Sequence, residues 1–445
     1  MLLLGGGRLI TRDPAMPFIE DGAVLIDGEV IIKVAETTKL RAEHPDAEFI
    51  DARGGVIMPG LINAHNHIYS AFARGLMIKD NTTRNFLEIL DHLWWTIDRH
   101  LLLDDTAASA DATFIDCIEN GVTSIVDHHA SYGEIPGSLF AIADSARRYG
   151  VRACLCYEIS DREGEDKFKQ AVKENVDFTL HARKDNGGMI AGMMGMHAPF
   201  TLSDKSLEYA AARNPEDAGY HIHAAEGIDD VRLTLKEHGK RPVFRLHDFG
   251  ILGEHTILGH CTHVNAAEID LIAATDTMVA HNPESNMGNA IGCPPVLEMF
   301  HKGIRIGLGT DGYTNDMIES YKVANILHKH NKCDPTVAWG EIPEMLFVSN
   351  AKMASQFFGR ETGILKPGAA ADVIATDYIP PTPMHAGNVN AHVMFGMNGR
   401  SVTTTIIAGE VRMRHRQLAG VDKQRVMAHC RERARDLATR INAGR

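Results

Sequence analysis

The sequence predicts an α/β protein built on a (β/α)8 TIM barrel, with a small β-sandwich domain made from both chain ends. Residues 56–365 alternate short apolar segments with helix-like segments eight times over about 300 residues, which is the number and length that such a barrel needs. Both flanks of this region are rich in β-branched residues and turn signals. A doubly wound sheet would instead carry a glycine-rich dinucleotide turn after its first strand, and the sequence has none there.

The positions of the strands and helices follow from the hydrophobic pattern. Apolar runs of roughly four to eight residues are typical of strands buried on both faces of a parallel sheet. They lie at Gly60–Ala64, Val122–Asp127, Val151–Glu158, Met189–Met196, Tyr220–His223, Thr256–Gly259, Thr277–Ala280 and Ile304–Leu308. Longer segments between them predict helices at Asp105–Asn120, Gly137–Tyr149, Asp166–Ala182, Lys205–Ala212 and Ala266–Ala274.

The flanks predict one β-rich domain that is discontinuous in sequence. Asp27-Gly28 separates two β-branched runs in the first flank, which is a hairpin signal, and Ala-Gly-Glu at 408–410 resembles it near the other end. A tail rich in Arg and Ala predicts a closing helix. The predicted units are a composite β-sandwich (1–55 with 366–420), a catalytic barrel (56–365) and a C-terminal helix (421–445).

Composition excludes several classes of protein. The net charge is −13 and no basic block occurs, so nucleic acid and anionic membranes are poor partners. The N-terminal segment lacks the basic region of a signal peptide, and no apolar run reaches the length of a membrane span. Seven scattered cysteines, an odd number, indicate a reducing compartment. We therefore expect a cytoplasmic protein.

The first barrel strand ends in two histidines one residue apart, His65 and His67. Side chains two positions apart in a strand project from the same face, so this pair can bind one metal ion. In a barrel, the active site lies at the carboxyl ends of the strands. Metal-capable or titratable groups also lie at the ends of nearly all the remaining predicted strands: Asp127, His128, His129, His197, His221, His223, Glu226, His260, His263, His281 and Asp311.

These strand ends carry recognisable motifs: PGLINAHNH, HIHAAE, LGHCTH, HNPESNMGNAIG and GLGTDG, in this order. The sequence resembles the amidohydrolase superfamily, in its aminohydrolase and chlorohydrolase branch that includes guanine deaminase. The segments FARG, LWW followed by DR, and DHHAS are most similar to the SsnA group of aminohydrolases. The resemblance covers essentially the whole chain.

The resemblance implies a metal site formed by His65, His67, His223 and Asp311. Three imidazoles and one carboxylate suit a single divalent ion, Zn²⁺ first and Fe²⁺ as the alternative. Two-metal members of the superfamily carry a carboxylated lysine at the end of strand four, and this strand has no lysine. One metal is therefore expected. His221 would support the site or pack in the barrel.

The resemblance also implies three catalytic residues. Glu226, three residues after His223, would take a proton from a metal-bound water and pass it to the substrate. His260 would orient the water or stabilise an oxyanion. Asp311 would both bind the metal and accept a proton.

Substrate contacts are expected from several residues near the strand ends. Tyr69, in the loop after strand one, and Trp94 would form a wall of the substrate pocket. Trp94 and Trp95 are adjacent, and neighbouring side chains on a helix point apart, so at most one of the two can face the site. His197 is also expected to contact the substrate. Either His129 or His128 could reach it, or both could be structural. Ser285 and Asn286 could bind the substrate or instead hold their loop in shape.

The expected reaction is hydrolytic deamination of a purine- or pyrimidine-like amino-heterocycle by a metal-bound hydroxide, with release of ammonia. Ring opening of a cyclic amide or ureide and dechlorination of a triazine use the same chemistry and are the alternatives. A non-catalytic relative would lack metal ligands, whereas all four are present here. By resemblance, the partners are a small heterocyclic substrate and further copies of the chain, in a homodimer or a higher homo-oligomer.

Overall fold

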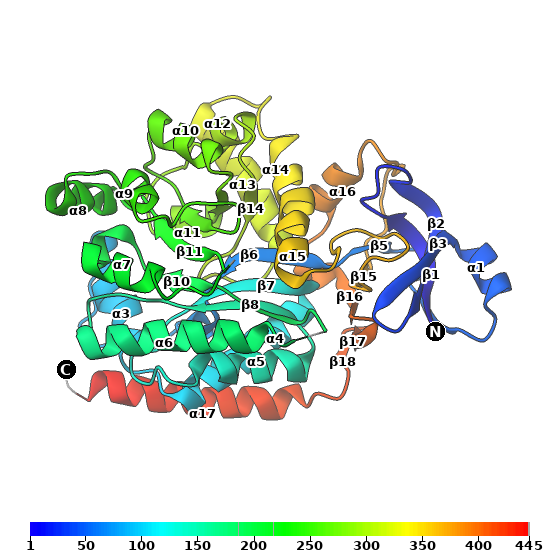
Figure 1. Ribbon diagram of the computed structural model, residues 1–445. Coiled ribbons are helices and arrows are strands. Elements are labelled where there is room, and N and C mark those ends of the chain that lie inside the picture. The colour runs from blue at the N-terminus through cyan, green and yellow to red at the C-terminus, as the bar shows by residue number, and fades with distance from the viewer. Residues whose placement is uncertain (186, 217, 444–445) are drawn as a thin grey trace.

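The structure is a computed structural model that describes residues 1–185, 187–216 and 218–443. It contains two parallel sheets surrounded by helices and one larger sheet beside them (Figure 1). The parallel sheets are buried on both faces, which matches the continuous apolar runs of the sequence. The four-stranded sheet contains β6 (Leu61–Asn66), β7 (Val122–His129), β8 (Arg152–Tyr157) and β9 (Ile190–Gly192), in that order. The five-stranded sheet contains β10 (Met194–Met196), β11 (Tyr220–Ala224), β12 (Ile257–His260), β13 (Met278–His281) and β14 (Ile306–Leu308).

Each predicted barrel strand is present, but one of them is divided. The run Met189–Met196 forms β9, which pairs with β8, and then β10, which pairs with β11. A single stretch of chain thus connects the two parallel sheets. At their opposite edges, Asn66 and Asp311 form an isolated parallel bridge, so the end of β6 lies beside the segment that follows β14.

Helices cover the outer faces of these sheets (Figure 1). All five predicted helices are present, as α4, α5, α6, α7 and α10, with ends that differ from the prediction by no more than two residues. The helices between β6 and β14 are α2 (Phe86–Ile89), α3 (Trp95–Asp98), α4 (Leu103–Glu119), α5 (Ser138–Tyr149), α6 (Glu165–Ala182), α7 (Asp204–Ala211), α8 (Ile228–His238), α9 (Pro242–Asp248), α10 (Ala266–Ala274), α11 (Pro283–Gly288) and α12 (Val296–His301). After β14 follow α13 (Met317–Lys332), α14 (Glu341–Glu344), α15 (Asn350–Phe358) and α16 (Val389–Gly396).

Both chain ends contribute to one nine-stranded sheet. Its order is β18-β17-β16-β15-β5-β1-β2-β3, with β4 paired to β1. Helix α1 (Thr37–Glu43) follows β3. The prediction of a sandwich of two packed sheets is not confirmed by this single connected sheet. The strands are β1 (Leu2–Ile10), β2 (Phe18–Asp27), β3 (Val30–Glu36), β4 (Glu48–Asp51), β5 (Val56–Pro59), β15 (Val373–Thr376), β16 (Val402–Ile407), β17 (Glu410–Arg414) and β18 (Gln417–Leu418).

Two glycine turns from opposite ends of the chain meet in this sheet. Gly28 joins β2 to β3 and Gly409 joins β16 to β17, both with positive φ, +57° and +74°. A Cβ atom on Gly409 would lie only 1.8 Å from the carbonyl oxygen of Gly28. Glycine is therefore required at position 409 for both its backbone conformation and its close contact.

The C-terminal helix α17 (Lys423–Asn442) runs along α4 (Figure 1). Arg433 and Arg440 both form ion pairs with the buried carboxylate of Asp105 at the start of α4. The predicted helix is confirmed between these bounds, and residues 444–445 lie outside the described residues. Among the described residues, no helix combines the length and apolarity that crossing a membrane requires.

A buried ion pair ties the parallel strands to the outer sheet. Arg152, at the start of β8, donates from Nε to Asp372 Oδ2 at 2.8 Å, and the two side chains are 0% and 1% exposed. Asp372 directly precedes β15 and also accepts a hydrogen bond from the Ala408 amide. The pair therefore fixes the outer sheet against the start of β8.

Replacing Arg152 by Met should lower the free energy of unfolding by about 3–5 kcal/mol, because it leaves the Asp372 carboxylate buried without a counter-charge. Unfolding in guanidinium chloride, followed by circular dichroism, measures this loss. Lys169→Met, which breaks the exposed pair with Glu165, is the control and should leave the midpoint near its original value. Equal midpoints for the two variants would contradict the structural role of Arg152.

Candidate active site

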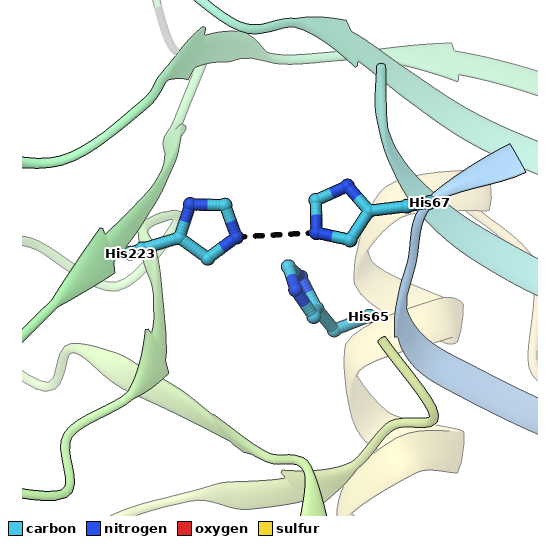
Figure 2. Close-up of side chains that lie close together, drawn as sticks. All are labelled: His65, His67 and His223. Carbon is cyan, nitrogen blue, oxygen red and sulfur yellow. Dashed lines mark hydrogen bonds between the residues drawn. The ribbon is translucent and has the colours of Figure 1, made fainter. Parts of the chain in front are cut away.

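Three imidazoles from distant parts of the chain converge at the carboxyl ends of the parallel strands. Figure 2 shows His65 and His67 from the end of β6 facing His223 from β11. The Nε2 atoms of His67 and His223 lie 3.3 Å apart. His65 and His67 project to the same side, as their spacing in a strand predicts.

Backbone carbonyls determine which nitrogen of each ring is free. His67 Nδ1 lies 2.6 Å from the carbonyl oxygen of His128, and His223 Nδ1 lies 2.9 Å from that of His197. A carbonyl can only accept, so both Nδ1 atoms carry the proton and both Nε2 atoms present lone pairs to the shared space. His65 Nδ1 is 2.8 Å from His221 Nε2, and His65 Nε2 is buried without a partner among the described residues.

Asp311 completes this group. Its Oδ1 atom is 3.0 Å from His67 Nε2 and 4.0 Å from His65 Nε2. Ligand atoms of His65, His67 and His223 lie within 4.8 Å of one another, as do those of His65, His260 and Asp311. Lone pairs that approach so closely repel each other unless a cation lies between them, and three imidazoles with one carboxylate form a suitable set for a divalent metal.

The electrostatics of the group also favour a cation. Burial lowers the pKa of His65 well below its ordinary value, which keeps this ring neutral and able to coordinate. Burial also opposes protonation of His67, yet the Asp311 carboxylate raises the pKa of His67 to about 9. The space between these side chains therefore stabilises a positive charge, which a proton or a metal ion can supply.

Glu226 and His260 lie beside this group. His260 Nε2 is 3.7 Å from Glu226 Oε1 and 3.5 Å from Asp311 Oδ2. Burial and the nearby Asp311 carboxylate raise the pKa of Glu226 well above its usual range. A carboxyl group that can hold a proton near neutral pH is suited to proton transfer.

Asn286 has a role that the sequence did not reveal. Its Oδ1 atom lies 2.7 Å from His260 Nδ1, so the amide oxygen accepts the Nδ1 proton and leaves Nε2 directed toward Glu226 and Asp311. The sequence indicated only that Asn286 could contact substrate or hold its loop. This hydrogen bond joins the end of β12 to α11, which meet only in the folded chain, so no local pattern in the sequence could have predicted it.

The backbone at the site is strained. His260 has a φ of +66° and Asp311 a φ of +56°, and Ala225, directly before Glu226, has a φ of +49°. Each non-glycine residue in this region costs about 1–3 kcal/mol, which the surrounding structure must offset. Such strain re-aims the side chains at strand ends toward a common centre.

A cavity lies over this centre. Of the predicted substrate residues, Tyr69, Trp94, His197 and Ser285 line it. Ser285 Oγ also accepts a hydrogen bond from Asn289. Sequence reasoning missed these lining residues: Phe86, Leu90, Glu158, Asn289, Gly312 and Tyr313.

The expectation that only one of the two tryptophans faces the site is wrong, because both line the cavity. Residues 90–94 form a π-helical turn and Trp95 begins α3. The wider turn brings the Trp94 ring to 6.0 Å from Tyr69 and the Trp95 ring to 5.8 Å from His197. The two indoles thus approach the cavity from different sides.

His128 and His129 are packed among other rings and are not among the cavity-lining residues of the described chain. His128 donates from Nε2 to the carbonyl oxygens of Met196 and His221, at 2.9 and 3.2 Å. His129 lies between Tyr69 and Tyr157, with ring centroids 6.0 and 5.8 Å away. Burial lowers the pKa of His129 to about 3, so this ring is a neutral packing element.

A cluster of metal-capable side chains with an adjacent buried acid defines the class of protein, a metal-dependent hydrolase. Comparison with known proteins agrees. The Amidohydrolase family pattern matches residues 56–412. The chain is 31% identical to the 5'-deoxyadenosine deaminase of Methanosarcina acetivorans and 30% identical to the 5-methylthioadenosine/S-adenosylhomocysteine deaminase of Pelotomaculum thermopropionicum, covering 99% of each chain in both cases.

Among solved structures, an adenosine deaminase from Xanthomonas campestris with bound zinc is similar, with a TM-score of 0.86 and 23% identity over 98% of both chains. The chain therefore belongs to the amidohydrolase family, and it is a metal-dependent hydrolytic deaminase. The resemblance seen in the sequence is confirmed at this level, whereas the finer likeness to the SsnA group stays a prediction.

His65→Ala should lose bound metal and activity together, because His65 belongs to both groups of potential ligands. Elemental analysis of protein purified from metal-supplemented medium measures the ion content per chain. The exposed His429 serves as the control, and His429→Ala should keep the original content. A His65→Ala protein with unchanged metal content would show that the ligand is misassigned.

Proposed function

We propose that this protein removes the amino group of an adenine nucleoside by hydrolysis and releases ammonia, using one zinc ion. The observation that carries the proposal is the convergence of His65, His67, His223 and Asp311 beside Glu226 at one cavity. The relatives named above, which match along the full length of the chain, support adenine nucleosides as the substrate class.

The proposed architecture is a closed (β/α)8 barrel formed by both parallel sheets. The division of one predicted strand into β9 and β10, and the bridge between Asn66 and Asp311, support closure on both sides. The proposed domains remain the barrel at 56–365, the composite β-sandwich of 1–55 with 366–420, and the C-terminal helix at 421–445. The β5 strand begins the barrel segment but pairs with β1 and β15 of the outer sheet.

The proposed metal ligands are His65, His67, His223 and Asp311, and their unpaired lone pairs support this assignment. When bound, a zinc ion lowers the pKa of a coordinated water toward 7 and so supplies a nucleophile at neutral pH. Neither β9 nor β10 contains the lysine that a second metal would require. This absence supports one ion.

The proton path is assigned to the chain's own side chains. Glu226 would take a proton from the attacking water and deliver it to the ring nitrogen beside the amino-bearing carbon. His260 Nε2, oriented by Asn286, would stabilise charge that develops on the attacking oxygen. Asp311 Oδ2, 3.5 Å from His260 Nε2, would accept the second proton of the attacking water and pass it to the amino group, which can then leave as ammonia.

The cavity walls would hold the planar base. Tyr69, Trp94 and Trp95 offer aromatic faces or edges for stacking. His197 Nδ1 is 2.9 Å from Thr201 Oγ1, which would leave Nε2 for the substrate. Ser285 would provide a hydroxyl. From the sequence resemblance we also propose a homodimer or a higher homo-oligomer, and seven free cysteines support a cytoplasmic location.

Incubation of the zinc-loaded protein with adenosine and 5'-deoxyadenosine should release ammonia and produce the corresponding 6-oxopurine nucleosides. Ammonia is quantified by a coupled assay, and the product is identified by ultraviolet absorbance and mass. A cyclic ureide and a chlorotriazine test the alternative reactions. Ring opening without ammonia, or chloride release alone, would contradict deamination as the main activity.

Glu226→Gln should retain the metal and lower kcat by roughly 100- to 10,000-fold, because the amide cannot accept and return a proton. Turnover and metal content are measured on the same preparation, which separates lost catalysis from a lost site. Glu237→Gln on α8 changes an exposed acid and provides the matched control. Full activity of Glu226→Gln would show that another group transfers the proton.

A further inference from the structure

Glu158 is a buried acid in the wall of the cavity that has no part in the mechanism above. It follows β8 directly, is 3% exposed and lines the same cavity as His67, His197 and Glu226. Its backbone is fixed on both sides: the amide donates to the His129 carbonyl at 2.7 Å, and the Tyr132 hydroxyl donates to the Glu158 carbonyl at 2.6 Å. The Glu158 side chain therefore extends from a rigid point of the backbone, directly after β8.

A buried guanidinium holds one oxygen of this carboxylate. Arg162 Nη2 donates to Glu158 Oε1 at 3.1 Å, and the same guanidinium makes two hydrogen bonds to Asp98, at 2.5 and 3.2 Å. The guanidinium also packs on the rings of Tyr132 and Trp95, with 4.3 and 5.1 Å to the centroids. Arg162 thus cannot swing toward the cavity, and it holds the Glu158 carboxylate in one orientation.

The second oxygen remains available. His128 Nδ1 lies 3.7 Å from Glu158 Oε2, which is too far for a hydrogen bond, and Oε2 has no hydrogen-bond partner among the described residues. His128 already donates from Nε2 to two carbonyls, so its Nδ1 presents a lone pair and does not satisfy Oε2. Glu158 and Asp98 share the Arg162 guanidinium, and of these two acids only Glu158 lines the cavity.

We propose that Glu158 is a specificity-determining residue that accepts a hydrogen bond from a donor group of the substrate lying away from the reacting amino group. This inference rests on the proposed function. An adenine ring substituted at N9 carries no N–H donor besides the amino group that is removed, and its other ring nitrogens only accept. In an adenine nucleoside, the donors that remain are the sugar hydroxyls, so Glu158 selects a nucleoside with a free hydroxyl over one without it.

The same carboxylate could accept from the ring N–H of an oxopurine or of a free base. The two sources of the donor are separated by a substrate series: adenosine, 2'-deoxyadenosine, 3'-deoxyadenosine, 5'-deoxyadenosine, 2',3'-dideoxyadenosine and guanine. Each is assayed with the zinc-loaded full-length protein, as wild type, as Glu158→Gln and as Glu165→Gln. Glu165 is an exposed acid on α6 and is the matched control.

Glu158→Gln should lower kcat/KM for adenosine by roughly 10- to 100-fold, mainly through KM, as expected for the loss of a charged hydrogen bond. For the analogue that lacks the contacting hydroxyl, wild type and Glu158→Gln should agree within about 2-fold, because the bond is absent in both. Equal losses on adenosine and on every one of its deoxy analogues would overturn the inference, since they would indicate a purely structural residue, while deamination itself would stand.

If Glu158→Gln does not fold, the wild type alone decides. Its kcat/KM should fall by roughly 10- to 100-fold when the contacting hydroxyl is removed, and equal values for all five nucleosides would overturn the inference. A wild type that deaminates guanine and no adenosine analogue contradicts the proposed nucleoside substrate. Where the wild type acts only on guanine and Glu158→Gln does fold, a loss on guanine in this variant supports the acceptor role with a ring N–H as its donor, and no loss overturns it.

Discussion

Two backbone carbonyls, of His128 and His197, determine the chemistry of this protein. Each accepts the Nδ1 proton of a facing histidine, His67 or His223, and so directs both Nε2 atoms into one small space. The rings are buried, where burial alone disfavours a proton on either of them. Lone pairs held at 3.3 Å require a positive charge between them, which a proton or a metal ion can supply. The rest of the site is arranged around that requirement.

Supporting side chains repeat the same arrangement one layer out. His221 holds His65 and Asn286 holds His260, so each ring near the centre has one nitrogen engaged and the other directed inward. The positive φ values of His260 and Asp311 show that the backbone adopts unfavourable conformations to reach this geometry. The buried strands on either side, and the packing of α4, α5 and α6 on β7 and β8, provide the rigidity that offsets this strain.

The cavity has two walls of different character. One carries Glu226, Asp311 and the metal-capable histidines, where covalent bonds would change. The other carries Glu158, held by Arg162, which Asp98 in turn anchors, and there a substrate would only be recognised. This arrangement would separate substrate recognition from the reacting group in space, although Glu158 also contributes to the raised pKa of Glu226.

Much of this protein is predictable from local sequence. Burial on both faces makes parallel strands continuously apolar, so the strand positions follow from the hydrophobic pattern, and the alternating geometry of a strand is enough to place His65 and His67 on one side. The Ala-Gly-Glu turn at 408–410 is predictable for a similar reason, because only glycine adopts its backbone conformation easily. Periodicity, turn chemistry and motif order are properties of neighbouring residues.

Tertiary structure alone decided the contacts between residues far apart in sequence. The pairing of Asn286 with His260, the placement of both Trp94 and Trp95 at the cavity and the cluster of Glu158, Arg162 and Asp98 have no local signature. A hydrogen bond depends on distances below about 3.5 Å and on the direction of each atom, and these follow from how the strands and helices pack. The sequence by itself therefore determined which elements form and which chemical groups end them, whereas the packed structure decided which of those groups meet.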